Sequence, residues 1–439
     1  MERFDTIIIG GGPAGLMAAI QASSAGERVL LLEKNANLGV KLLLSGRGRC
    51  NFTNGEENTD AFLDRYGENG RFLYSAFSRF GPAQTLDFFH QNGVETVMER
   101  GKRIFPVPGR ADSGGQRILD VLLLLCKKGN VRILRNASVK AMKVRKPRRE
   151  GELAHAERLI TGVEELEAKR YIIATGGKSY PKTGSTGDGY RFAQAAGHTI
   201  VPTYPALVPI RTRETWVKLA HGCNLRNVNI TVMVNGRKAE EHFGEMEFTN
   251  FGVSGPIVME MSARVPDWID EAKRGTSPEE KGEAPGGGVV QLSLDLKPAL
   301  PHDKLRTRIA QDFQTEGSRR FDGALRRLVP GHLIPMILEL SDVPPDKPVA
   351  YISSEEIEAL TRLLKDIRLT VNGLWSFNNA VVTRGGVSLK EVDPRTMRSR
   401  LCDNLYFAGE VLDLNGPSGG FNLQVCWSTG YIAGRAAEA

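Results

Sequence analysis

The chain has 439 residues and a formal net charge of +7, a length that predicts two or three packed units rather than one core. Its 41% hydrophobic and 25% charged residues exclude a disordered or fibrous chain. No apolar run approaches the length that crosses a bilayer, and the five cysteines include no Cys-x-x-Cys pair, which argues against a disulfide framework or a zinc site. The start of the sequence shows no secretory leader, so we expect a cytoplasmic protein without membrane or metal.

The first residues read as strand, glycine turn, helix and strand, which is the opening of a parallel doubly wound sheet. The strands are predicted at 5–9 and 28–33, and the helix at 16–25. Between them lies the pattern Gly-x-Gly-x-x-Gly, in the context that dinucleotide binding requires. We expect Gly10 to form the tight turn, Gly12 to let the backbone approach a pyrophosphate, and Gly15 to let the helix pack on the strand.

Further elements follow along the chain, and the pattern of apolar and polar residues changes twice. Near residue 195 an alternating pattern begins, with a hairpin signal at Asn235-Gly236 and a Pro/Gly/Glu-rich loop at 275–288. Near residue 380 the buried-strand texture returns, so one sheet-based domain formed by 1–195 and 380–439 is predicted to carry an insertion. The other predicted elements are helices at 83–92, 116–128, 357–366 and 427–437, a region of helical periodicity from 302 to 340, and strands at 131–133, 139–144, 171–174, 229–234, 289–296, 369–371 and 405–408.

The basic excess is uneven. Residues 200–380 contain 22 Lys/Arg and 24 Asp/Glu, which leaves 36 and 27 for the rest of the chain. The sheet-based domain therefore carries a net charge of +9, which permits a nucleic-acid partner. Basic residues cluster at 140–149, Arg319-Arg320 and Arg326-Arg327. Such clusters are most often solvated surface, and the alternative is that they contact RNA phosphates.

Two more glycine loops indicate that the dinucleotide is FAD. An apolar strand ends on Ala174-Thr175-Gly176-Gly177, and another ends on Ala408-Gly409-Glu410. They resemble the second and third fingerprints of two-dinucleotide-binding-type flavoproteins, in which the last acidic residue contacts the ribityl chain. Glu410 stands where Asp is usual, so Asp413 is a rival for that contact. A second Gly-x-Gly-x-x-Gly for NAD(P)H is missing from the sequence, which argues against a disulfide reductase.

Four stretches together resemble the YhiN/BaiN group of bacterial flavoproteins, often labelled the aminoacetone oxidase family. They are 41–54 (KLLLSGRGRCNFTN), 248–256 (FTNFGVSGP), 382–387 (VTRGGV) and 409–423, which contains GEVLD and GPSGGFNL. The resemblance implies an α/β fold in three parts: a Rossmann-like FAD-binding domain at 1–195 and 380–439, an inserted β-barrel at 196–300 and 346–379, and a small helical subdomain at 301–345.

The resemblance also implies a reductase that adds a hydride to a polarised carbon–carbon double bond. Members are linked to the reduction of uridine to dihydrouridine in 23S ribosomal RNA, and others to the reduction of enone-type steroids. NAD(P)H is the expected transient electron donor. We rank 23S rRNA or its precursor first as substrate, a small-molecule enone reductase or amine oxidase second, and a non-catalytic flavin-containing RNA-binding protein third. A monomer is compatible with the sequence.

Such a reaction needs a proton donor near the flavin. Cys50, in the glycine-rich loop that the family places close to the flavin, is the first candidate, although an inert buried cysteine is the commoner role. Tyr180, Cys426 and His221 are weaker candidates. The residues expected to hold FAD are Gly10, Gly12, Pro13, Ala14, Gly15, Glu33, Lys34, Lys41, Ser45, Gly46, Gly48, Arg49, Asn51, Val139, Ala174, Thr175, Gly176, Gly177, Gly409, Glu410, Asp413, Gly419, Gly420, Phe421, Asn422 and Leu423.

Overall fold

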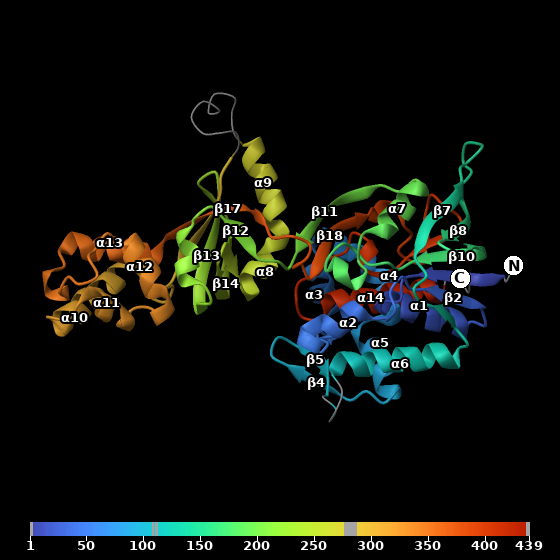
Figure 1. The fold of residues 1–439 in the computed structure, drawn as a ribbon, viewed down its shortest axis with the longest axis horizontal. Coiled ribbons are helices and arrows are strands. Elements are labelled where there is room, and N and C mark those ends of the chain that lie inside the picture. Colours follow the sequence, from blue (N-terminus) through green and yellow to red (C-terminus); the bar gives the residue numbers. More distant parts are fainter. Residues whose placement is uncertain (1–2, 108, 110–112, 276–287, 436–439) are drawn as a thin grey trace. The chain divides into compact units, whose positions relative to one another are not determined.

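The computed structural model of the chain describes residues 3–107, 109, 113–275 and 288–435, and it divides into two units (Figure 1). Unit 1 is Met1–Pro205 with Phe377–Ala439, and unit 2 is Ala206–Ser376. Each unit has its own cluster of buried apolar side chains. Two predicted segments lie partly outside the described residues. They are residues 276–287 of the loop predicted at 275–288, and residues 436 and 437 of the helix predicted at 427–437.

A five-stranded parallel sheet forms the centre of unit 1, as predicted for a doubly wound α/β fold. Its strand order is β19-β10-β1-β2-β6. The bounds are β1 Phe4–Ile9, β2 Val29–Leu32, β6 Arg132–Leu134, β10 Ala168–Ile173 and β19 Leu405–Phe407. Strand β1 lies between β2 and β10, so the chain leaves the carboxyl ends of β1 and β10 in opposite directions. Ligands of such sheets bind in the crevice at this point.

Helix α1 (Pro13–Ser24) packs against the last helix, α14 (Phe421–Arg435), and against α6 (Gly114–Lys128). The contact with α14 is close, because a Cβ on Gly430 would lie 2.5 Å from the carbonyl oxygen of Ala14. Helix α14 begins at Phe421, six residues before the predicted start at 427. Our prediction was wrong because it followed the small residues alone, whereas Gly419 and Gly420, both at positive φ, make the turn into the helix.

Smaller elements surround this sheet in unit 1. Three small sheets have the orders β3-β5-β4, β7-β8-β9 and β11-β18. Their strands are β3 Thr53–Asn54, β4 Thr96–Glu99, β5 Arg103–Pro106, β7 Val139–Arg145, β8 His155–Thr161, β9 Glu165–Leu166, β11 Ile200–Ala206 and β18 Val382–Val387. The remaining α-helices are α2 Val40–Leu44, α3 Thr59–Leu63, α4 Tyr74–Phe80, α5 Pro82–Gln91 and α7 Asp188–Ala195, and a 3₁₀ segment, η2, spans Asp64–Leu73.

Six strands of unit 2 close into a barrel in the order β12-β15-β14-β13-β16-β17. They are β12 Ile210–Thr212, β13 Asn224–Val234, β14 Arg237–Thr249, β15 Gly252–Ser254, β16 Val290–Asp295 and β17 Ile367–Leu374. Its helices are α8 Pro256–Met261, α9 Val265–Arg274, α10 His302–Glu316, α11 Phe321–Ala324, α12 Ile334–Leu340 and α13 Ser354–Lys365. Asn235 and Gly236 join β13 to β14 with φ of 49° and 75°, as a two-residue hairpin turn requires. Within the described residues no helix is long and apolar enough to cross a membrane.

Candidate functional site

The turn between β1 and α1 has the geometry of a phosphate-binding loop. Gly10 has a φ of 111°, and a Cβ there would lie 2.4 Å from the carbonyl oxygen of Ala174. A Cβ on Gly15 would lie 1.9 Å from the carbonyl oxygen of Gly10, whereas one on Gly12 would meet nothing within 4 Å. Gly10 and Gly15 are therefore required by packing, and Gly12 leaves open space beside the start of α1, where Pro13 opens the helix and Ala14 is buried. Helix N–H groups that face such a space attract phosphate.

Glu33 follows β2 and is 8% exposed. One carboxylate oxygen accepts from the Gly11 N–H at 2.9 Å and the other from the Asn35 N–H at 2.8 Å. These bonds fix the carboxylate beside the glycine turn, the position expected for a ribose contact. Val139 lies at the buried start of β7, and Ala137, two residues earlier, donates its N–H to the Glu33 carbonyl oxygen.

Lys34 extends from the same strand end toward helix α7. Its Nζ donates to Asp188 at 2.8 Å and to Thr186 at 2.6 Å. Burial opposes ionisation of Asp188, but bonds from Lys34, Thr186 and Arg191 outweigh it and hold the pKa of Asp188 at about 2. Lys34 thus anchors α7 to the end of β2.

The loops after β10 and β19 meet beside the glycine turn. The Ala174 N–H donates to the Ile9 carbonyl, and Gly176 has a φ of 71°. A Cβ on Gly189 would lie 2.1 Å from the Thr175 hydroxyl oxygen, so the two residues are in close contact. Gly409 has a φ of 76°, and a Cβ there would lie 2.8 Å from the side chain of Ala14. The two predicted fingerprints and the first glycine turn are therefore brought together in space.

Glu410 is fixed by a set of charged and hydroxyl groups that we call the Glu410 network: Lys41, Ser179, Thr383 and Glu410. Lys41 Nζ donates to the Glu410 carboxylate and to Ser179 Oγ, both at 2.6 Å. The other carboxylate oxygen accepts from Ser179 Oγ and from the Thr383 N–H, both at 2.7 Å. Thr383 Oγ1 accepts from the N–H groups of Lys178 and Ser179 at 2.8 and 3.0 Å.

Sequence reasoning missed Ser179 and Thr383, both fully buried. A signal was present in each case, because Ser179 lies two residues after Gly177 and Thr383 lies in a stretch that carried the family resemblance. Their packing also explains Gly177, where a Cβ would lie 2.4 Å from Thr383 Oγ1. Asp413, the rival of Glu410, is separate from this network. Burial raises its pKa, against the opposing effects of Asn69 and Arg384.

The loop after α2 combines strain with burial. Gly46, Arg47, Gly48 and Cys50 all have positive φ, between 56° and 85°. Ser45 Oγ donates to the Leu42 carbonyl at 2.6 Å and so holds the start of the loop. Cys50 is fully buried, and burial raises the pKa of its thiol to about 12, against a lowering bond with Ser45. The Cys50 thiol is therefore protonated at neutral pH, and its catalytic role stays a prediction.

Asn51 supplies a direct indication of a missing partner. Both amide atoms of its side chain are buried and form no hydrogen bond within the described protein. A Cβ on Gly420 would lie 2.6 Å from Asn51 Oδ1, so the orphaned amide adjoins the glycine turn that opens α14. Buried amides without partners are rare in native proteins. A polar ligand beside Asn51 explains this one, and together with the open space at Gly12 the residues fit a bound dinucleotide.

The turn before α14 is fastened by its own side chains. The Asn422 amide accepts from the Gly416 N–H at 2.9 Å and donates to the Gly416 and Pro417 carbonyls. Phe421 packs against Phe62 and is 7% exposed, and Leu423 packs partly buried against the core. The backbone of Gly419 and Gly420 is what this turn leaves available to a ligand. Arg49 pairs with Glu99 and stacks over Phe105 at 4.2 Å, and its contact with FAD stays a prediction.

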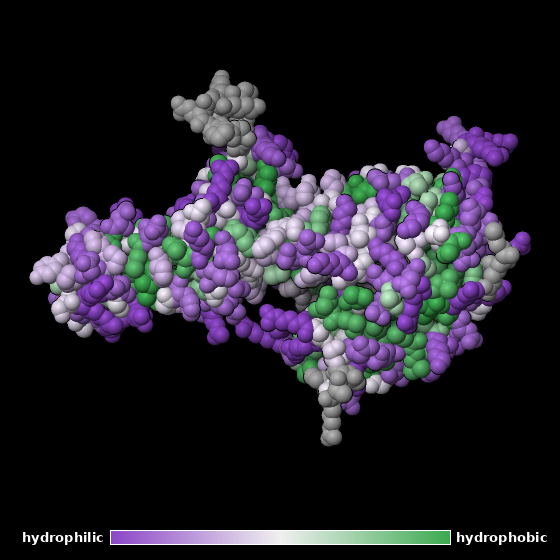
Figure 2. Space-filling view, in the orientation of Figure 1, coloured by the Kyte–Doolittle hydropathy of each residue, from purple (hydrophilic) through white to green (hydrophobic). Residues whose placement is uncertain are grey.

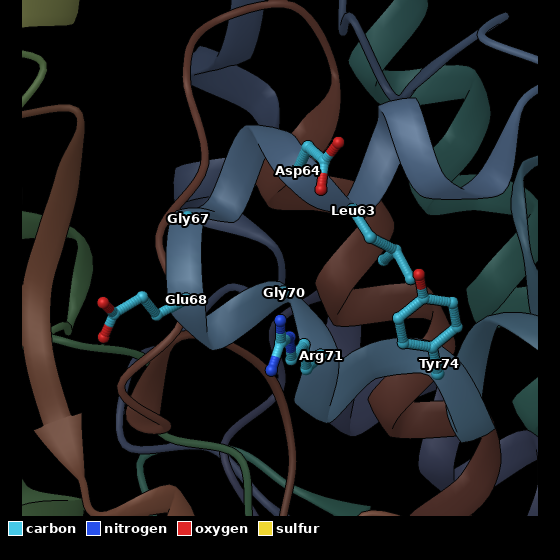
Figure 3. Close-up of a pocket in the computed structure, with 7 residues that line it drawn as sticks. All are labelled: Leu63, Asp64, Gly67, Glu68, Gly70, Arg71 and Tyr74. Carbon is cyan, nitrogen blue, oxygen red and sulfur yellow. The ribbon is translucent and has the colours of Figure 1, made fainter.

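Two further features of unit 1 are a cysteine near Glu410 and a hollow outside the glycine loops. Cys426 in α14 lies near Glu410, and its thiol pKa is raised to about 12 by burial and by that carboxylate. A hollow of about 520 Å³ on η2 is lined by Leu63, Asp64, Gly67, Glu68, Gly70, Arg71 and Tyr74 (Figure 3). This hollow shares no residue with the glycine loops or with the Glu410 network. Among the described residues no group of acidic, histidine and cysteine side chains could hold a metal ion.

The parallel sheet, the phosphate turn and the polar cradle around Glu410 define the chain as a flavoprotein oxidoreductase. The chain belongs to the HI0933-like family, whose description, "HI0933-like protein Rossmann domain", matches residues 4–436. It is 32% identical over 432 residues to the 3-dehydro-bile acid delta(4,6)-reductase of Clostridium scindens, with 98% of each chain covered. It is 31% identical to the ribosomal RNA dihydrouridine synthase of Escherichia coli, with 98% of this chain and 97% of the relative covered.

Solved structures resemble the fold at low sequence identity. The 3-ketosteroid delta1-dehydrogenase from Sterolibacterium denitrificans matches with a TM-score of 0.53 at 12% identity, and both chains are fully covered. The open conformation of a flavocytochrome c3 fumarate reductase matches with a TM-score of 0.51 at 17% identity, over 99% of this chain and 78% of that one. These matches describe the architecture alone.

Proposed function

We propose that the protein is an FAD-dependent reductase that uses NAD(P)H to convert uridine to dihydrouridine in 23S ribosomal RNA. The observation that carries the RNA substrate is the net charge of +9 outside residues 200–380, the part of the chain that contains the predicted cofactor loops. RNA binding depends on such an excess, whereas a neutral small substrate gains nothing from it. Support also comes from two relatives named ribosomal RNA dihydrouridine synthase, at 31% and 30% identity over nearly the full chain. This substrate places the activity in the cytoplasm.

The chain's own groups divide the binding of FAD among them. The first turn of α1 would hold the pyrophosphate, Glu33 would hold the ribose, and the Glu410 network would present a fixed carboxylate to the ribityl chain. Asn51 and the backbone at Gly419 and Gly420 would bind the polar part of the ring. When bound, FAD supplies the hydride that saturates the double bond.

Cys50 is proposed as the proton donor for the neighbouring carbon. Its thiol is neutral and holds a proton throughout the physiological pH range, because burial raises its pKa to about 12. The Cys50→Ala variant is expected to keep bound FAD and RNA affinity but to lose at least about 100-fold in turnover, the usual size of a general-acid contribution. Cys50→Ser tests the chemistry of the sulfur. A Cys50→Ala enzyme with wild-type turnover removes Cys50 from the mechanism.

The deciding experiment is anaerobic. The bound FAD is reduced with NADH or NADPH, unmodified 23S ribosomal RNA is added, and flavin reoxidation is followed by absorbance. The RNA is then digested and analysed for dihydrouridine by mass spectrometry. Reoxidation with one new dihydrouridine is the expected result. A flavin that stays reduced in the presence of RNA contradicts the proposed substrate.

A small-molecule reductase is the second candidate, and one observation favours it: the bile acid reductase is as similar as the RNA enzymes, at 32% identity. The same reduced protein is therefore offered a steroid enone. In a further arm the oxidised protein is given an amine, which would reduce the flavin of an amine oxidase, and then oxygen, which would reoxidise it. Reoxidation by the enone alone establishes the second candidate. A protein that binds RNA but is reoxidised by neither RNA nor enone is the third candidate, a flavin-containing RNA-binding protein.

A further inference from the structure

We infer that a cluster of cations beside the flavin loops binds the phosphate backbone of the RNA substrate. The cluster consists of Arg47, Arg49, Arg100, Lys102 and Arg103, and we call it the basic rim. The inference rests on the proposed RNA substrate and deepens it, because it assigns the surface on unit 1 that the RNA contacts.

The basic rim is tied directly to the cofactor loops. Strand β5 pairs with β3, with Thr53 opposite Ile104 and Asn54 opposite Arg103. The Asn54 amide donates both to the Gly101 carbonyl, at 3.1 Å, and to the Gly419 carbonyl, at 2.9 Å. One side chain therefore joins the tip of the β4–β5 hairpin to the glycine turn that adjoins Asn51.

The ring of Phe105 lies close to cations of two segments, the loop after α2 and strand β5. The Arg49 guanidinium lies over its ring at 4.2 Å, and that of Arg103 at 5.9 Å. A Cβ on Gly46 would lie 3.6 Å from the same ring, so the strained loop also packs against it. Arg103 Nε further donates to the Arg100 carbonyl at 3.0 Å. Two cations of the rim, Arg49 and Arg103, therefore share one buried aromatic ring, against which the loop that carries Arg47 also packs.

Carboxylates neutralise only part of the rim. Arg49 pairs with Glu99, and Lys102 pairs with Glu56 at 2.7 Å. Arg47, Arg100 and Arg103 are exposed and form no ion pair within the described part of the chain. Arg47 is held at a φ of 57°, in a loop that uses Gly46 and Gly48 to present it. Arg103 lies opposite Glu99 across the β4–β5 pairing, and its charge helps to lower the pKa of that carboxyl, so Glu99 is shared between Arg49 and Arg103. Exposed guanidinium groups that carboxylates neutralise only in part suit phosphate oxygens, which accept their N–H groups in pairs.

The other basic clusters are less suited to this role. Arg319 and Arg327 both pair with Glu316, and Arg320 pairs with Asp322, so three of the four arginines singled out in unit 2 are engaged with carboxylates. The β7–β8 hairpin, whose tip is hydrophilic in Figure 2, carries exposed Lys140, Lys143 and Lys146. Its first strand begins at Val139, two residues after Ala137, which donates its N–H to Glu33. Among the residues that the structure describes, no hydrogen bond joins this hairpin to the turn at Gly419.

The test compares two matched triple variants that each remove three exposed cations from unit 1. One is Arg47→Gln, Arg100→Gln, Arg103→Gln in the rim. The other is Lys140→Gln, Lys143→Gln, Lys146→Gln in the β7–β8 hairpin. Affinity of the full-length, FAD-loaded protein for a transcribed fragment of 23S ribosomal RNA is measured by fluorescence anisotropy over a series of salt concentrations. Flavin absorbance and thermal unfolding confirm that both variants are loaded and folded.

The rim variant is expected to bind RNA at least tenfold more weakly than wild type near physiological salt, and its plot of log affinity against log salt should be shallower by about two, for three lost single-strand phosphate contacts. The hairpin variant should stay within about threefold of wild type. An unchanged rim variant, or an equal loss in the hairpin variant, overturns the inference while RNA remains the substrate. Wild-type protein that binds no RNA contradicts the proposed function itself.

Discussion

Gly12 and Gly15 belong to one motif but do different work, and this difference can be measured. A side chain at Gly12 meets only open space and requires no unusual φ, whereas one at Gly15 collides with the Gly10 carbonyl oxygen at 1.9 Å. Gly12→Ala should therefore leave the melting temperature of the FAD-free protein nearly unchanged but weaken FAD binding at least about tenfold, because it occupies the phosphate position. Fluorescence quenching of FAD and thermal melting measure the two effects.

Gly15→Ala is the matched variant. It should destabilise unit 1 itself, by about 1–3 kcal/mol, because an overpacked contact cannot relax against backbone. Equal melting temperatures for the two FAD-free variants would contradict the separation of roles.

Thr383 is expected to position Glu410 without touching a ligand. Thr383→Val removes the acceptor of two buried N–H groups, those of Lys178 and Ser179, and should weaken FAD binding about tenfold as the Glu410 network loosens. Thr383→Ser keeps the hydroxyl and should restore affinity. Thr361→Val is the control, since Thr361 is equally buried but bonds only within its own helix in unit 2. Wild-type FAD affinity in Thr383→Val would show that Glu410 needs no such support.

The low pKa of Asp188 predicts that the free energy of unfolding falls in acid. Its folded-state pKa of about 2 lies below the ordinary value of 3.8, so the Lys34–Asp188 contact stabilises the fold above about pH 4 and loses this contribution as the pH falls toward 2. The difference corresponds to about 2 kcal/mol. Urea unfolding of wild type and Asp188→Asn should differ near neutral pH and converge near pH 2. Curves that stay parallel through this range would contradict the assignment.

At the scale of elements, the sequence predicted best where one local rule acts alone. Asn235-Gly236 makes its hairpin turn, and the order of strand, glycine turn and helix at the start of the chain is as expected. It predicted least where the determinant is distant in the chain. The Glu410 network joins Lys41, Ser179 and Thr383, which no spacing rule connects, and the orphaned Asn51 amide is visible only once α14 lies beside it.

Helix α13 begins at Ser354, three residues before the predicted start at 357. Ser353 is its N-cap and forms a capping box with Glu356, which therefore already lies in the first turn. Ser353→Ala removes the hydroxyl that accepts from the Glu356 N–H and should destabilise unit 2 by about 1 kcal/mol. Chemical unfolding followed by circular dichroism measures the loss. Ser353→Asp, which can cap the helix, should retain most of the stability.

At the scale of the whole molecule, the two separate apolar cores predict two unfolding transitions in calorimetry. The predicted cofactor residues all lie in unit 1, so added FAD should raise the melting temperature of one transition and leave the other in place, since a ligand stabilises only the fold that binds it. Ser353→Ala should lower the second transition selectively. A single transition that FAD shifts as a whole would contradict independent cores.

The close packing of α1 on α14 has a consequence for the order in which the protein matures. On the ribosome, the phosphate turn emerges first, yet β19, the Glu410 loop and α14 are synthesised only after the whole of unit 2. Until then the nascent chain lacks the helix against which its first helix packs. Loading of the cofactor is therefore a late event, and a nascent chain stalled before residue 405 should be unable to retain FAD however much of unit 2 has folded.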